Sequence, residues 1–359
     1  MEKLNPFDKN AQQNKEEENT SSSDEEEKIS GSSSDEDGGE DRPDGFSLDQ
    51  IRRKYANNQL SVKVVEQLNP HVLDELNLEG VVEYIKQGRA NNIIVLVGAG
   101  ISTGAGIPDF RTPGTGLYSK IANSDSSNSP AGLDIRYFSE NPKPMFDLIK
   151  ELYLDHNPTL THYFIALLEK KGLLLRVYTQ NVDSLELEAG LGKDKLVESH
   201  GSINTSHCLQ CSKEHSRGWT KERILSDTLP KCNECQGLVK PDVLLFGEDL
   251  PEKYFTCLEQ DFKICDLLII LGTSLLVQPF CGLIDCVKNT CPRLLINKEK
   301  VGIATDLSSI LEKKGLQYDS PGNYRDVHVG TDTDTGCKTL SEKLGWNSDL
   351  QKLFKSEKK

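Results

Sequence analysis

The chain has 359 residues, enough for one large domain or two moderate domains with a buried core. Its net charge of -14 is concentrated at the start, because residues 1–45 hold fifteen acidic and five basic residues and so account for -10. The near-neutral remainder excludes tight, sequence-independent binding of nucleic acid, which requires a basic surface. Basic protein segments are the expected electrostatic partners.

The first 76 residues fall into two segments. Residues 1–45 carry the runs SSSDEEE and SSSDEDGGE and few apolar side chains, so we predict a disordered tail. Residues 46–76 form a predicted lead-in segment. Its leucines Leu73 and Leu76, with Leu78, belong either to a helix packed on the core or to an export-signal-like cluster. A short helix is expected over residues 78–88.

The N-terminus lacks the pattern of a secretory signal or a transit peptide, and no apolar run is long enough to span a bilayer. The expected location is therefore the cytoplasm, with shuttling to the nucleus open, and no membrane is an expected partner. In these compartments the ten cysteines should be reduced thiols or metal ligands.

A glycine-dense loop follows the first strong strand signal. Residues 93–97 are five apolar residues, typical of a strand buried on both faces of a parallel sheet. Gly98, Gly100 and Gly104 follow in the spacing G-x-G-x-x-x-G, which departs from the common dinucleotide fingerprint G-x-G-x-x-G. Such glycines let main-chain N–H groups approach a phosphate. A phosphate site and a plain turn both remain open on this observation alone.

Further strands are expected to end in polar clusters. After a Gly-, Ser- and Asn-rich loop at residues 112–134, typical of a lid, a helix is expected from Asn157 to Gly172. Six more strand-like runs occur at residues 173–178, 196–198, 242–246, 266–271, 293–296 and 326–329. Most of them precede small polar residues. Because ligands bind at the carboxyl ends of parallel strands, these clusters predict one composite site.

Two CxxC pairs lie in a segment that does not follow this pattern of strands and polar clusters. Cys208 and Cys211 are separated by twenty residues from Cys232 and Cys235. Four thiolates in two knuckles suit tetrahedral zinc and leave no open coordination position, so we predict one structural Zn²⁺. His207 and His215 remain possible replacement ligands.

These motifs together resemble the sirtuins over residues 77–350. The resemblance rests on the motifs GAGIS, GIPDFR, TQNVD, HG, KPDVLLFGE, GTSL and NKE, in this order, with the two CxxC knuckles between HG and KPDVLLFGE. Within the family, residues 294–300 and the segment ending in LSEKLGW resemble the class I branch whose cytosolic type is associated with tubulin deacetylation.

The resemblance implies an α/β fold with a large Rossmann-like parallel-sheet domain. A smaller domain would combine a zinc-ribbon module, about residues 204–238, with a helical insertion, about residues 112–170. The catalytic domain would span residues 77–350 and be followed by a C-terminal tail at 351–359. The implied activity is NAD-dependent removal of acetyl or longer neutral acyl groups from protein lysines, with release of nicotinamide and O-acyl-ADP-ribose. Acetylated histone-like or tubulin-like proteins are possible partners.

The same resemblance implies the NAD-binding residues. For the pyrophosphate, the ribose and the nicotinamide pocket they are Ala99, Gly100, Ile101, Ser102, Thr103, Asp109, Phe110, Arg111, Gln180, Asn181, Val182 and Asp183. For the adenosine half they are Thr273, Ser274, Asn297, Lys298, Glu299 and Cys337. Asn181 and Asp183 are expected to orient the carboxamide and count as catalytic. Cleavage of a glycosidic bond needs an enclosed pocket that stabilises cationic character on the ribose.

His200 is the candidate general base, because imidazole titrates near neutral pH and can accept a ribose hydroxyl proton. A lone histidine is more often structural, and its HG position in the family motif favours catalysis. The acylated peptide is expected to lie extended beside Val239, Phe246, Gly247, Glu248, Val277 and Gln278. The loop TPGTGLYSKI contains Tyr118 but no arginine to pair with an acidic acyl group, which favours neutral acyl chains.

Three other functions compete with deacylation. A mono-ADP-ribosyltransferase would use the same NAD, and a catalytically silent acyl-lysine-binding scaffold would recruit partners through the acidic tail. A scaffold is expected to lack His200, Asn181 or Asp183, all of which are present. The departure from the dinucleotide fingerprint weighs against the third, a hydride-transferring dehydrogenase.

Overall fold

The computed structural model describes residues 71–109, 116, 133–303, 314–320 and 322–356, all within one compact unit, Val62–Lys359. The predicted tail, most of the lead-in segment and most of the predicted lid therefore lie outside the described residues, as do Phe110, Arg111 and Tyr118. No described helix is both long and apolar enough to cross a bilayer.

A six-stranded parallel sheet forms the centre of this unit, as the fold prediction requires. Its strand order is β3-β2-β1-β7-β8-β9. The strands span Leu196–Glu198 (β3), Leu174–Thr179 (β2), Ile93–Val97 (β1), Leu267–Leu271 (β7), Arg293–Ile296 (β8) and Asp326–Val329 (β9). The two central strands, β1 and β7, are five-residue apolar runs buried along their whole length, as expected for strands covered on both faces.

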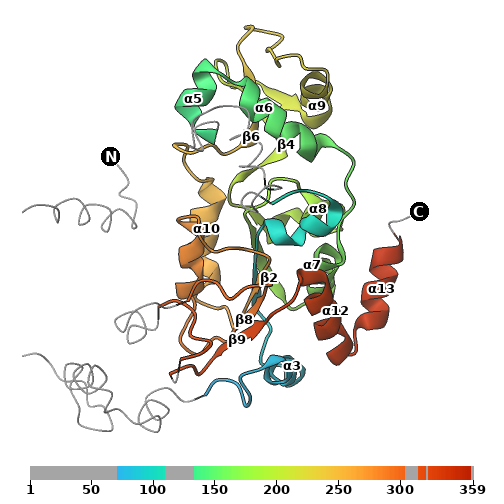
Figure 1. The fold of residues 1–359 in the computed structure, drawn as a ribbon, viewed down its shortest axis with the longest axis vertical. Helices are drawn as coiled ribbons and strands as arrows, with labels where there is room; N and C mark the ends of the chain where they lie inside the picture. The colour runs from blue at the N-terminus through green and yellow to red at the C-terminus, as the bar shows by residue number, and fades with distance from the viewer. Residues whose placement is uncertain (1–70, 110–115, 117–132, 304–313, 321, 357–359) are drawn as a thin grey trace, which may run out of the picture. The chain divides into compact units, whose positions relative to one another are not determined.

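Helices cover both faces of the sheet (Figure 1). Alternate residues of β1 point to opposite faces, so Ile93 and Val95 join one core cluster and Ile94 and Leu96 join the other. The first cluster is covered by α3 (Leu78–Lys86), α7 (Leu160–Lys170), α12 (Thr333–Lys343) and α13 (Asn347–Ser356). The second is covered by α10 (Glu252–Asp261) and the 3₁₀ helix η7 (Phe280–Asp285).

A three-stranded antiparallel sheet forms the smaller part, in the order β5-β4-β6. These strands span Glu214–Ser216 (β5), Gly201–Cys208 (β4) and Val239–Val243 (β6). A third core cluster joins β4 to α5 (Ile135–Glu140), α6 (Lys143–Lys150) and α9 (Arg217–Leu225). Short elements complete the described part: η2 (Ala99–Ile101), η3 (Thr103–Ala105), η5 (Glu151–Tyr153), α8 (Leu185–Glu188) and η6 (Lys193–Lys195).

Two expectations about this part differ from the structure. The strand expected at residues 242–246 of the parallel sheet is β6, which begins at Val239 and pairs antiparallel with β4. An apolar run indicates a strand but does not specify which strand it will pair with. The helix α7, at the end of the expected insertion, packs in the first core cluster on the parallel sheet, because its buried face carries Tyr163, Phe164 and Leu167.

Candidate active site

A cavity of about 600 Å³ lies where the loops after β1, β2, β7 and β8 meet the loop after β6. Most of the predicted site residues line it. From the predicted NAD set they are Ala99, Gly100, Thr103, Asp109, Gln180, Asn181, Val182, Thr273, Ser274, Asn297, Lys298 and Glu299. From the predicted base and groove they are His200, Phe246, Gly247, Glu248, Val277 and Gln278.

Cys337 and Val239 are two of the predicted site residues that do not line the cavity. Cys337 is fully buried in α12 within the first core cluster, and it does not line the cavity. Burial raises the pKa of its thiol, so it is a small core residue there. The side chain of Val239 is fully buried beside Cys208 and Cys232 and does not line the cavity. Val243, Leu244 and Leu245, further along the chain, line the cavity instead.

The glycines after β1 are required by packing as well as by any ligand. A Cβ on Gly100 would lie 2.7 Å from the Cα of Gly272, and a Cβ on Gly98 would lie 2.7 Å from the Cβ of Thr273. The N–H of Gly100 donates to the carbonyl oxygen of Gly272 at 2.8 Å. Gly272 itself has a φ of +56°, in the left-handed region. Two loops at the ends of the central strands therefore touch, backbone to backbone.

A buried chain of hydrogen bonds lies behind this wall. The amide of Asn181 donates to the carbonyl oxygen of Gly98 and to the hydroxyl of Ser102, both at 3.2 Å. Ser102 donates in turn to Asp183 Oδ2 at 2.7 Å, and the main-chain N–H of Leu185 donates to Asp183 Oδ1 at 3.0 Å. Ser102, Asp183 and Ile101 are buried and do not line the cavity. Ser102 and Asp183 hold Asn181 in place, and Asn181 does line the cavity.

His200 is held in one orientation at the cavity. Its Nδ1 lies 3.1 Å from the carbonyl oxygen of Gln180. Because a carbonyl oxygen only accepts, Nδ1 carries the proton and Nε2 of the neutral ring is an acceptor. Burial lowers the pKa of His200, although the bond to Gln180 opposes that shift. Gly201 follows with a φ of +75°, and a Cβ there would lie 1.8 Å from the carbonyl oxygen of Asp242.

The loop after β6 is tied to both sides of the cavity. The N–H of Leu244 donates to the carbonyl oxygen of His200 at 2.8 Å. Phe246 exchanges main-chain hydrogen bonds with Leu133 and Ile135, at 2.7 and 3.1 Å. This loop connects the candidate base to the start of α5.

Sequence reasoning missed an apolar part of the cavity wall. It is lined by Leu133, Met145, Leu148, Ile149 and Leu152. Three of these residues lie on α6, and their spacing at positions 145, 148 and 149 is typical of one helix face. This spacing can be read from the sequence, but the sequence does not show that this face of α6 lines the cavity.

The four cysteines of the CxxC pairs come together. The Sγ atoms of Cys208 and Cys235 are 3.4 Å apart, and those of Cys211 and Cys232 are 3.7 Å apart. Tetrahedral thiolates at about 2.3 Å from zinc lie about 3.8 Å from one another, so this donor set fits the metal. Main-chain N–H groups of Gln210 and Gly237 point to the sulfur atoms of Cys208 and Cys235, both at 3.4 Å.

The two histidines left open as ligands do not belong to the four-cysteine cluster, although the His215 side chain lies beside Cys232. His207 Nδ1 lies 2.8 Å from the carboxylate of Asp242. The ring of His215 packs on Trp219, with centroids 4.2 Å apart. Among the described residues, the metal-ligand cluster here contains the four cysteines alone.

The sequence is similar to those of known proteins. Residues 98–279 match the model of the Sir2 family. The chain is 50% identical to the NAD-dependent protein deacetylase sirtuin-2 of Danio rerio, over 80% of this chain and 76% of the relative. It is 41% identical both to the NAD-dependent protein deacetylase hst2 of Schizosaccharomyces pombe and to the NAD-dependent protein deacetylase sirtuin-3 of Mus musculus, in each case over 79% of this chain and 81% of the relative. The chain therefore belongs to the Sir2 family.

Proposed function

We propose that this protein removes acetyl groups from lysine side chains of other proteins, with NAD as co-substrate. The products are nicotinamide and O-acetyl-ADP-ribose. The relatives named as NAD-dependent protein deacetylases support this activity. The observation that carries it is a neutral His200, with an accepting Nε2, in the wall of the same cavity as the loop after β1.

The residues of the cavity fit a dinucleotide. The loop at Ala99–Thr103 and Asp109 would hold the pyrophosphate and the nicotinamide ribose, and Asn297–Glu299 would hold the adenosine half. Glu299 is a suitable carboxylate acceptor for ribose hydroxyls. When bound, NAD supplies the ribose carbon that the acyl oxygen attacks. Asn181, held by Ser102 and Asp183, would orient the carboxamide, and the enclosed wall would exclude water.

His200 would act as the general base by taking a proton from a ribose hydroxyl at Nε2. We expect His200→Ala to lower turnover by about 100- to 10,000-fold while NAD still binds, because the ring contributes a proton acceptor rather than most of the binding surface. Turnover and NAD binding by calorimetry measure the two effects separately. The matched control is His71→Ala, an exposed histidine outside the cavity, which should leave both unchanged.

The pH dependence offers a further check on His200. A general base must be unprotonated, and burial lowers the pKa of His200. The acid limb of turnover is therefore expected below the ordinary histidine pKa of about 6.5. Undiminished turnover in His200→Ala, or an acid limb well above that value that persists in the variant, would assign the base to another residue.

Product analysis separates deacetylation from the alternatives. Incubation with NAD and an acetylated lysine peptide should yield equal amounts of nicotinamide and O-acetyl-ADP-ribose. ADP-ribose attached to protein, without deacetylated peptide, would indicate a mono-ADP-ribosyltransferase. Peptide binding without either product would indicate a scaffold, and NADH formation would indicate a dehydrogenase.

The protein substrates are acylated lysine-containing proteins, and histone-like and tubulin-like substrates are our proposals within that class. Longer neutral acyl chains fit the apolar wall beside α6 better than acidic ones. We also propose one structural Zn²⁺ on Cys208, Cys211, Cys232 and Cys235, a catalytic domain at residues 77–350, and a cytoplasmic location with possible nuclear shuttling. Comparison of acylated peptides in a lysate before and after treatment tests the substrate class.

A further inference from the structure

A second polar cluster lies outside the cavity, behind Asn181. It consists of His162 on α7, Asp183 in the loop after β2, and Glu186 on α8. One side-chain nitrogen or oxygen atom from each of the three lies within 4.8 Å of the others, and all three residues are buried. Nε2 of His162 and both carboxyl oxygens of Glu186 lack a hydrogen-bond partner of ordinary geometry. Buried polar atoms of this kind call for a specific explanation.

The capping box of α7 determines the proton position on His162. The main-chain N–H of Thr159 donates to His162 Nδ1 at 3.1 Å, and the Thr159 hydroxyl oxygen lies 2.8 Å from the same nitrogen and 2.9 Å from the carbonyl oxygen of Ile101. Since a main-chain N–H can only donate, Nδ1 is the acceptor and the ring proton is on Nε2. Burial lowers the pKa of His162 to about 3, so the ring is neutral. The ring nitrogen without a hydrogen-bond partner, Nε2, therefore carries a proton rather than a lone pair, which argues against a metal ion.

The two carboxyl groups have different partners. Burial raises the pKa of Asp183, and the hydrogen bonds that it accepts from the N–H of Leu185 and from the Ser102 hydroxyl oppose that rise and favour its ionised form. Glu186 lies close to Asp183; the Thr179 hydroxyl lowers the pKa of Glu186, and the charge of Glu198 on β3 raises it to a smaller extent. Burial and the charge of Asp183 raise the pKa of Glu186 to about 8. Two other titratable groups affect the pKa of Asp183: the charge of Glu188 raises it, and the charge of His156 lowers it.

Two carboxylates this close in a buried site cannot both be charged without a large cost. We propose that Glu186 holds one proton at neutral pH and, together with the Nε2–H of His162, positions the ionised Asp183 behind the nicotinamide side of the cavity. The cluster then carries a single negative charge, connected through Ser102 to Asn181. Glu186 and His162 are thus positioning residues, and this inference rests on the deacetylase function proposed above.

The test compares Glu186→Gln with Glu186→Leu. Glutamine keeps the size and donor capacity of a protonated carboxyl group, whereas leucine keeps only the volume. The readout is exchange of labelled nicotinamide into NAD in the presence of acetylated peptide, from about pH 6.5 to about pH 9, a range that spans the ionisation of a raised carboxyl group. Thermal melting and zinc content check that each variant is folded.

We expect Glu186→Leu to lower exchange about 100-fold, because a displaced pocket group has an effect of that order, and Glu186→Gln to restore most of it. The unmodified protein should lose exchange as Glu186 ionises above about pH 8, and this alkaline loss should be absent in Glu186→Gln. Glu83→Gln is the control, because Glu83 forms an exposed pair with Lys86 on α3 and is not among the groups that act on the cluster; it should retain the alkaline loss.

Two results would overturn the inference. One is a folded Glu186→Gln as inactive as Glu186→Leu, which would show that an ionised Glu186 is needed. The other is a loss of exchange at alkaline pH that persists unchanged in Glu186→Gln. This result would exclude Glu186 as the titrating group even if Glu186→Leu does not fold. Failure of the deacetylase proposal is distinct, because the unmodified protein would then lack exchange at every pH.

Discussion

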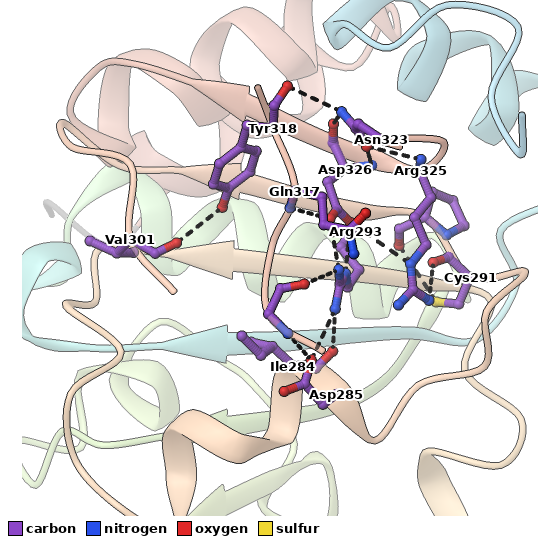
Figure 2. A network of polar contacts seen from close by, with 12 residues as sticks. Ile284, Asp285, Cys291, Arg293, Val301, Gln317, Tyr318, Asn323, Arg325 and Asp326 are labelled. Atoms are coloured by element: carbon purple, nitrogen blue, oxygen red, sulfur yellow. Dashed lines mark hydrogen bonds and ion pairs between the residues drawn. The ribbon is translucent and has the colours of Figure 1, made fainter. Parts of the chain in front are cut away.

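At the scale of single residues, the buried guanidinium of Arg293 shows how strands β8 and β9 are held together (Figure 2). Arg293 begins β8 and forms two bonds of 2.7 Å to the carboxylate of Asp326, its register partner at the start of β9. Its remaining N–H groups donate to the carbonyl oxygens of Ile284 and Gly315, at 2.9 and 2.7 Å, and to Asp285. Asp326 also accepts from the N–H of Gln317 at 2.8 Å. One side chain thus connects β8, β9 and η7.

We expect Arg293→Met to lower the free energy of unfolding by about 3–5 kcal/mol, because it leaves the buried carboxylate of Asp326 without its charged partner. Urea denaturation measures the change. Lys86→Met, which removes the exposed pair with Glu83, is the control and should have a much smaller effect. Equal losses in the two variants would mean that burial does not set the contribution of the Arg293 pair.

At the scale of elements, Lys240 on β6 fixes the shape of the loop that follows β6, and we call this set of contacts the Lys240 clip. Its buried ammonium group donates to the carbonyl oxygen of Val243 at 2.7 Å and to Glu248 at 3.0 Å. Glu248 also accepts from the N–H of Leu245 at 2.8 Å. The clip closes the loop that carries Phe246 and Gly247, so the cavity wall takes its shape from a lysine outside the predicted groove.

We expect Lys240→Met to raise the KM for an acetylated peptide about tenfold, equivalent to about 1.4 kcal/mol, because the loop loses its fixed shape. The KM for NAD should change little, since the residues predicted to contact NAD lie on other loops. Steady-state kinetics with each substrate varied in turn measure both. Lys213→Met, which breaks an exposed pair with Glu234 in the cysteine module, serves as the control. A parallel rise in both KM values would contradict a role confined to the peptide side.

At the scale of the whole described unit, the parallel sheet and the cysteine module depend on different interactions. The sheet has an extensive core on each face, whereas the core cluster around Cys208 and Cys232 contains few buried apolar residues. Small modules of this type need a metal to fold. The module also carries β6, whose loop bonds to His200, so loss of the metal should reach the cavity.

We expect a strong chelator to release one zinc ion per chain, abolish deacetylation and lower the melting temperature, while most of the far-UV circular dichroism signal remains. The signal should persist because the parallel sheet and its helices do not contact the metal site. A zinc-sensitive dye measures the release, and readdition of zinc is the control that should restore activity. Full activity in metal-free protein would exclude the structural role.

Much of the fold and site could be predicted from local sequence. Burial of β1 follows from five consecutive apolar residues, and the zinc site follows from two short-range cysteine spacings. The convergence of Gln180, His200 and Thr273 on one cavity follows from the rule that ligands bind where parallel strands end. The burial of the Val239 side chain could not be predicted, because the sequence does not specify that β6 pairs with β4 inside the cysteine module.

The sequence by itself therefore determined the family, the metal ligands and the strand-end residues, because each depends on motifs only a few residues long. Only the tertiary structure decided that Gly100 packs against Gly272, that Lys240 clips the loop after β6, and that His162 meets Glu186. The Gly100–Gly272 and His162–Glu186 contacts each join separate elements. The Lys240 contact depends on how the loop after β6 folds back on its own strand. Strand order and helix packing set such contacts, and no local pattern encodes them.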